Sequence, residues 1–277
     1  GRPPPPPREG RPRPAMSDAP LPPLPPLDPV RHYNLQTHQY WGVKDPARFR
    51  QLMDEAAKLV VGGFYLGDNL FTWMRNLSLL EDTAFRAAWQ ANLLTTADEA
   101  IAWRRYVLCC AACHCLRLEG DFIECGALHG TGVKTVIDYF GREAFAKDFW
   151  VYDTFDTNPV AGHQFQGQEA GLYERVKARF AGYDRVRLVQ GLLPASLAGN
   201  SPARIAYLHL DLNSAEFEIA VLEALFDRLV PGALLILDDY EWSGGYRPQK
   251  TAEDPWFSAR DYRVIPLPTG QGLVIKR

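Results

Sequence analysis

The sequence predicts an α/β protein built on a Rossmann-like, doubly wound, mostly parallel seven-stranded sheet. From residue 121 onward, short apolar runs alternate with amphipathic stretches, as in parallel strands joined by helices. A glycine-rich turn follows the first apolar run. The last two runs, 262–266 and 272–276, are joined by a short Pro- and Gly-containing link, which favours a C-terminal antiparallel hairpin. We therefore assign 119–277 to this domain.

Five apolar runs are expected to be the other strands of the sheet, in chain order. A nearly continuous apolar run near the end is typical of a central parallel strand, buried on both faces. Between the fourth and fifth runs, Asn213 with Glu216 three residues later predicts a capped helix. The five runs are 122–123, 149–153, 186–190, 205–211 and 233–237.

The glycine-rich turn lies within Gly120–Gly132 and leads into a helix that begins near Val133. Glycine lets a ligand approach the main chain closely because no Cβ intervenes. A strand that delivers backbone amides to a helix N-terminus is a site for nucleotide-like ligands. The spacing is not GxGxxG, so a tight turn without a ligand is an equal alternative from this motif alone.

The region before the sheet divides into two parts. Residues 1–30 contain 13 of the 22 prolines, which predicts a disordered or polyproline-like leader. Met16 is the first methionine, and we expect the natural chain to start there. Residues 31–118 are predicted to be helical, with Asp45 as an N-cap before Pro46 and a capping box at Thr96–Glu99 that opens a long helix.

Composition excludes several classes of protein. The formal net charge of −3, without a basic stripe, gives no reason to expect a nucleic-acid partner. No apolar run approaches the roughly 18 residues that span a bilayer, and no signal peptide is recognisable, so we expect a cytoplasmic protein without a membrane partner. Cys110–His114 matches a haem-attachment pattern. Because haem attachment needs an exported chain, and because the motif lies within a helix and lacks a second pair of zinc ligands, we expect these cysteines to be structural.

Acidic residues follow the predicted strands where ligands bind in open α/β sheets. Asp153 ends the strand after the glycine turn, where a carboxylate can accept hydrogen bonds from a ribose; a loop-capping role is the alternative. Asp211 and the pair Asp238–Asp239 end neighbouring strands. Converging carboxylates favour a hard cation such as Mg²⁺, which would lower the pKa of a bound hydroxyl; pairing of Asp239 with an arginine such as Arg247 is the alternative.

From about Thr96 to its C-terminus the chain resembles class I S-adenosylmethionine-dependent O-methyltransferases, in particular the TylF/MycF/NovP (macrocin O-methyltransferase-like) group. The terminal hairpin also fits this fold. After Asp211 the chain reads Leu212–Asn213 in place of Gly-Asp, and no lysine base follows Asp211. The matching segments are 120–126, 151–156, 210–211 and 235–240.

The resemblance implies a set of site residues. The methionine end of the cofactor would contact Glu124, Gly126 and Gly130, with His129 where the family often has arginine. Asp153 would hold the ribose, and Gln190 and Gly191 would flank the adenine. Asp211 would adjoin the cofactor and, with Asp238 and Asp239, would hold Mg²⁺.

The function so implied is methyl transfer from S-adenosylmethionine to a hydroxyl of a small molecule, such as a sugar or natural product. Asp211 would be the catalytic base; His163 and His209 are weaker candidates. The segments 162–165 and 242–246 are expected to line the acceptor, and the apolar Leu70–Met74 segment would suit a homodimer. A metal-independent methyltransferase and a non-catalytic metabolite-binding protein are the alternatives.

Overall fold

The structure is a computed structural model that describes residues 33–156 and 169–277. The expected leader, Met16 and the segment 162–165 with His163 therefore lie outside the described residues. No helix within the described ranges is both long and apolar enough to cross a membrane.

The C-terminal part of the chain forms the predicted seven-stranded sheet, in the order β6-β5-β4-β7-β8-β10-β9. Neighbours from β6 to β8 pair in parallel, whereas β10 is antiparallel to both β8 and β9. The predicted fold class, including the closing hairpin, is confirmed. The strands are β4 (Asp121–Cys125), β5 (Phe149–Asp153), β6 (Val186–Gln190), β7 (Ile205–Leu210), β8 (Leu229–Leu237), β9 (Ile265–Pro266) and β10 (Gly272–Ile275).

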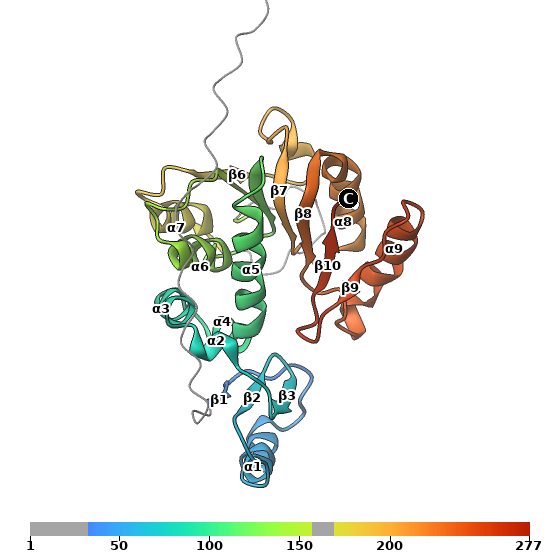
Figure 1. Cartoon of the computed structure of the whole chain (residues 1–277). Coiled ribbons are helices and arrows are strands. Elements are labelled where there is room, and N and C mark those ends of the chain that lie inside the picture. The colour runs from blue at the N-terminus through green and yellow to red at the C-terminus, as the bar shows by residue number, and fades with distance from the viewer. Residues whose placement is uncertain (1–32, 157–168) are drawn as a thin grey trace, which may run out of the picture.

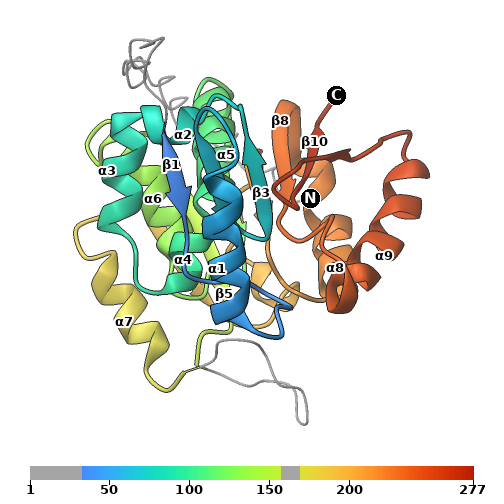
Figure 2. The same ribbon diagram turned by 90° about the horizontal axis from the view of Figure 1, so that it is seen from below.

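Helices cover both faces of this sheet and divide its core into two apolar clusters (Figures 1 and 2). The first cluster contains residues of α3 (Thr83–Ala91), α5 (Ala102–Cys115), α6 (Thr131–Phe140) and α7 (Leu172–Arg179). The second contains residues of α8 (Ala215–Leu225) and α9 (Arg247–Ser258). Helix α5 thus packs directly on the sheet, with Leu108 and Cys109 fully buried.

The N-terminal region is not only helical, which corrects the prediction for 31–118. It contains α1 (Pro46–Ala57), α2 (Ser78–Glu81) and α4 (Thr96–Ala100), and also a three-stranded sheet of β1 (Asn34–Gln36), β2 (Phe64–Gly67) and β3 (Leu70–Trp73). Strand β1 pairs with β2 across some 30 residues of sequence. Such short strands with a distant partner leave little local signal.

The β2–β3 link is a two-residue turn at Asp68 and Asn69, both with positive φ (53° and 57°). Asp and Asn tolerate this conformation better than most residues, and it matches the twist of a hairpin. The small sheet lies at the end of the large sheet where the parallel strands terminate (Figure 1). The hairpin turn therefore reaches the end of the sheet at which ligands bind.

Two helix starts differ from their predictions. The capping box is formed by Thr95 and Asp98, one residue earlier than expected, and the helix is interrupted at Ile101 between α4 and α5. Asn213 does not cap α8, because it has a φ of 55° and Ser214 occupies the N-cap position. The predicted cap of α1 is confirmed, since the Asp45 side chain accepts a hydrogen bond from the Arg48 amide.

Candidate active site

The glycine turn between β4 and α6 is shaped by close packing. Gly126 has a φ of 87°, and a Cβ there would lie 1.8 Å from the main-chain oxygen of Asp211. Gly130 has a φ of 70° and precedes α6, and a Cβ there would lie 2.6 Å from the Phe180 ring. Both positions require glycine, for conformation and for space.

A pocket of about 370 Å³ opens beside this turn. One wall is the end of β4 and the turn itself, and the opposite wall comes from the N-terminal region. Asp211, at the end of β7, closes one side. The lining residues are Gln39, Thr95, Thr96, Ala97, Asp98, Ile101, Arg105, Glu124, Gly126, Ala127, Leu128, His129, Thr131 and Asp211.

The pocket brings together four of the predicted cofactor residues, Glu124, Gly126, His129 and Asp211. Gly130 adjoins it through its neighbours His129 and Thr131. Among the described residues, the pocket wall does not include Asp153, Gln190 or Gly191. Gln190 instead donates from Nε2 to Asp156 Oδ1 (2.7 Å), and the Gly191 amide donates to the main-chain oxygen of Asp153 (3.0 Å).

Asp153 braces the glycine turn. Its Oδ2 accepts hydrogen bonds from the amides of Ala127 and Leu128, both at 2.8 Å, and its Oδ1 accepts from the Phe155 amide at 2.6 Å. These are the contacts of the loop-capping alternative. The role of Asp153 in holding a ribose stays a prediction.

The carboxylates of Asp211, Asp238 and Asp239 converge as predicted. One oxygen from each lies within 4.8 Å of the others. Burial and repulsion by the other two carboxylates raise the pKa of Asp211 well above its ordinary value. Burial and Asp238 likewise raise the pKa of Asp239 to about 6, against the opposing effect of Arg104. The cluster therefore holds more negative charge than it can easily accommodate.

Arg104 of α5 is a cation beside these carboxylates, so Asp239 does pair with an arginine, the alternative given from the sequence, but with Arg104 in place of Arg247. Its Nη1 donates to Asp238 Oδ2 (2.6 Å) and Asp239 Oδ1 (2.9 Å), while Nε and Nη2 donate to the two oxygens of Asp68 (2.6 and 3.1 Å). The guanidinium is buried. Burial alone would raise the pKa of Asp238, but Arg104 and His209 outweigh it and hold that pKa well below its usual range.

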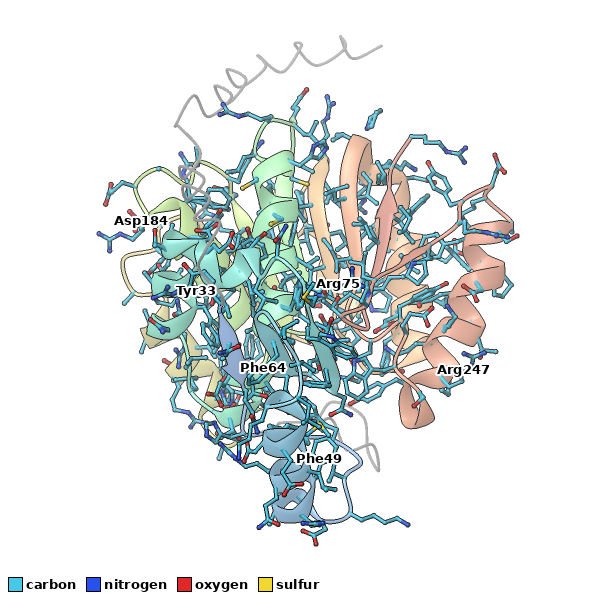
Figure 3. The ribbon with its side chains drawn as sticks, turned by 60° about the horizontal axis from the view of Figure 1, so that its bottom comes forward. Tyr33, Phe49, Phe64, Arg75, Asp184 and Arg247 are labelled. Carbon is cyan, nitrogen blue, oxygen red and sulfur yellow. The ribbon has the colours of Figure 1, made fainter. Side chains whose placement is uncertain are left out.

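Arg247, which the sequence offered as an alternative partner of Asp239, lies at the exposed start of α9, apart from α5 (Figure 3). The one local signal for Arg104 is the pair Arg104–Arg105 in an otherwise apolar helix. Arg105 faces the pocket, where its Nη2 donates to Thr131 Oγ1 (3.4 Å). A buried arginine in an apolar helix requires an acidic partner, but the sequence does not say which one.

His209 is a buried link between the pocket and the carboxylate cluster. Its Nδ1 lies 3.2 Å from Glu124 Oε2, and its Nε2 lies 3.2 Å from Asp238 Oδ1. Burial would lower the pKa of His209, but its hydrogen bond to Asp238 and the negative charge of the nearby Glu124 outweigh burial and raise it to about 10. A fully buried imidazole whose pKa is raised by neighbouring carboxylates acts as a structural cation and is a poor general base.

The cysteine-rich part of α5 packs against the core of the fold. Cys109 and Cys115 are buried, and His114 Nε2 lies 2.8 Å from the main-chain oxygen of Gly232. Burial raises the pKa of Cys110 and of Cys113 to about 11. Among the described residues, the group whose ligand atoms lie close enough together to hold a metal ion is Asp211, Asp238 and Asp239.

The fold and this arrangement define a Rossmann-like methyltransferase. The O-methyltransferase NovP has a similar structure, with a TM-score of 0.51 and 20% identity over 62% of this chain and 79% of NovP. The calicheamicin methyltransferase CalS11 matches with a TM-score of 0.51 and 17% identity over 71% of this chain and 92% of its own. At such identities the similarity concerns the fold.

The chain belongs to the macrocin O-methyltransferase (TylF) family, whose model matches residues 107–253. This confirms the family that the sequence motifs indicated. A curated relative from Streptomyces olivaceus, 8-demethyl-8-(2,3-dimethoxy-alpha-L-rhamnosyl)-tetracenomycin-C 4'-O-methyltransferase, is 31% identical over 142 residues. The match covers 44% of this chain and 54% of the relative, so the chain spans about half of that protein's length.

Proposed function

We propose that this protein transfers a methyl group from S-adenosylmethionine to a hydroxyl of a small molecule, with a sugar carried by a natural product as the acceptor class. The observation that carries the proposal is the shared position of Asp211. It lines the pocket beside the glycine turn and also belongs to the carboxylate cluster. A methyl donor in the pocket and a hydroxyl at the cluster would therefore meet at one residue.

The pocket suits the methionine end of the cofactor. Its polar wall combines the buried Glu124, the imidazole-bearing His129 and the hydroxyl-bearing Thr95 and Thr131. Because a sulfonium methyl is already activated, the protein mainly has to align the acceptor oxygen with the methyl and the leaving sulfur. The acceptor class follows from the family and from the rhamnosyl-modified substrate in the name of the relative.

Asp211 is the proposed base. Burial and the repulsion of Asp238 and Asp239 raise its pKa, so its carboxylate holds a proton more tightly than an ordinary aspartate. Its position at the pocket edge would let it take the proton of an acceptor hydroxyl. His209 is the weaker candidate for the base, because its two ring nitrogens face the carboxylates of Glu124 and Asp238.

Asp211, Asp238 and Asp239 would hold the divalent cation, Mg²⁺. Their donor set fits, because three hard carboxylate oxygens lie within 4.8 Å of one another and their mutual repulsion favours a cation. When bound, Mg²⁺ would supply Lewis-acid stabilisation of an ionised hydroxyl. The residues of this chain would orient the acceptor and accept its proton.

The test begins with calorimetry of the full chain with S-adenosylhomocysteine, with and without Mg²⁺, followed by turnover with rhamnosylated acceptors. Asp211→Asn should lower turnover by at least about 100-fold, the size of a general-base contribution, and by a larger factor than it weakens S-adenosylhomocysteine binding. Turnover in EDTA would favour the metal-independent alternative. Binding without turnover of any sugar hydroxyl would favour the binding protein, and no binding would refute the proposal.

We further propose a cytoplasmic homodimer that uses the exposed edge of the N-terminal sheet. Trp73 and Met74 are 48% and 67% exposed there, beside the half-buried Phe71. Large exposed apolar side chains in one place are typical of contact surfaces. Light scattering of the wild type and of a Trp73→Ser/Met74→Ser variant tests this: a monomeric wild type would contradict it.

A further inference from the structure

Arg104 occupies the place of a cation among the carboxylates. Its Nη1 bonds Asp238 Oδ2 at 2.6 Å and Asp239 Oδ1 at 2.9 Å, and its Cζ lies 5.3 Å from the centre of the Trp242 ring. Its side chain is 7% exposed. A unit charge at such distances in a buried site interacts strongly with each carboxylate, because the protein interior screens charges less than water does.

Both carboxylate oxygens of Asp238 accept hydrogen bonds while Arg104 is bound. Its Oδ1 accepts a hydrogen bond from Gln271 Nε2 (2.9 Å) and lies 3.2 Å from His209 Nε2, and its Oδ2 accepts from Arg104. By contrast, Asp211 Oδ1 has only a long contact of 3.4 Å with the Asn213 amide group. A metal ion that binds between Asp238 and Asp239 would therefore compete with the Nη1 group for these carboxylates.

Asp68 provides a second anchor for the displaced guanidinium. It binds Nε and Nη2, the edge of the guanidinium that does not face Asp239, in a two-point contact of the kind that suits arginine and carboxylate geometry. Asp68 belongs to the β2–β3 turn, and Gly67 beside it allows the turn to approach closely, since a Cβ there would lie 2.9 Å from the Ala100 main-chain oxygen. The anchor is thus part of the packed structure.

We propose that Arg104 is a built-in competitor of the divalent cation. Its guanidinium neutralises Asp238 and Asp239 in the metal-free protein, and it yields these carboxylates to the metal while Asp68 retains it. Metal affinity is thereby set by Arg104, which is not itself a metal ligand. The N-terminal hairpin contributes because its Asp68 holds the arginine. This inference rests on the metal site of the proposed function.

The test is calorimetric titration of the metal-free full chain with MgCl₂ at constant ionic strength. Arg104→Gln should bind Mg²⁺ at least about tenfold more tightly than the wild type, because the competing charge is gone. The matched control is Arg105→Gln, which loses the same charge one residue away but leaves the contacts to Asp238 and Asp239 intact. Its affinity should change by less than about threefold, since only the longer-range field is altered.

Thermal unfolding gives a second readout. Arg104→Gln should melt below the wild type in EDTA, and Mg²⁺ should restore most of the loss, whereas the wild type should shift little. Arg104→Lys retains the charge but cannot bond all three carboxylates, so its Mg²⁺ affinity should lie between those of the wild type and Arg104→Gln. This variant supplies the comparison if Arg104→Gln does not fold. Asp68→Asn, in which the arginine is balanced by Asp238 and Asp239 alone, should bind Mg²⁺ more weakly.

The proposal is overturned if both Arg104 variants bind Mg²⁺ no more tightly than the wild type, or if Arg105→Gln has an equal effect. S-adenosylhomocysteine titrations of the same proteins separate this result from the proposed function. Arg104 is not among the pocket-lining residues, so cofactor binding should persist in its variants. Loss of cofactor binding in every protein, wild type included, would refute the proposed function and leave the metal comparison interpretable.

Discussion

The Cα of Gly126 lies directly against the main-chain carbonyl of Asp211, so that an added Cβ would sit 1.8 Å from its oxygen. Strands β4 and β7 are neighbours, and the Asp211 amide donates to the Cys125 oxygen (2.8 Å) just before this contact. The glycine turn and the proposed base are consequently held as one unit.

Gly126→Ala should destabilise the protein by about 3 kcal/mol or more, since it combines a left-handed φ with a backbone clash. Gly141→Ala is the matched control: its φ is 84°, but nothing lies within 4 Å of an added Cβ. That variant should lose only about 1 kcal/mol. Urea unfolding of both measures the difference, and equal losses would mean that the contact with Asp211 can relax freely.

Asp153→Asn should weaken S-adenosylhomocysteine binding by about tenfold, because the two turn amides lose a charged acceptor at Oδ2. Calorimetry measures the affinity. The control is Asp148→Asn, which removes a carboxylate directly before β5, the strand that Asp153 ends. Repeating the titration with a 2′,3′-dideoxy analogue separates two roles. If Asp153 holds the ribose, the analogue binds both proteins alike; if it acts through the turn alone, the variant's deficit persists.

Stability should fall as the pH rises through neutrality, owing to the buried pair Glu218 and Glu253. Burial raises the pKa of Glu253 to about 7, and burial together with Glu253 raises that of Glu218. The folded state therefore retains protons that the unfolded chain releases above its lower pKa, and stability is lost from about pH 4.5 upward through pH 7.

Glu253→Gln removes this dependence and should be more stable than the wild type at pH 8 by about 2 kcal/mol, with a smaller difference at pH 5. Urea unfolding at both pH values provides the measurement. A variant that parallels the wild type, or one that loses stability at pH 8, would show that the pair does not titrate in this range.

The helix-borne thiols should react slowly. With its pKa raised from 9.0 to about 11 by burial, Cys110 would hold roughly 100-fold less thiolate at pH 7.5 than an unperturbed cysteine. Iodoacetamide labelling followed by mass spectrometry should show slow modification of Cys110 in the folded chain and rapid modification in urea. Fast labelling of the folded protein would contradict the raised pKa of this thiol.

Much of the fold and site could be predicted from local patterns. Alternating apolar runs specify a parallel sheet, because a strand buried on both faces must be apolar throughout. The topology then brings strand ends together, which is why Asp211, Asp238 and Asp239 could be grouped from the sequence. The capping box lies one residue earlier than predicted because Thr95 and Thr96 are chemically equivalent as caps. Which of the two caps the helix depends on the course of the backbone.

The sequence by itself determined the sheet, the glycine turn, the acidic strand ends and the family. Only the tertiary structure decided which charges meet. Arg104 joins Asp68 and Asp238, 36 and 134 residues away, and the small N-terminal sheet pairs strands of three or four residues across a long connection. Periodicity reports burial within one element, whereas partner choice depends on how separate elements pack, and no local pattern encodes that.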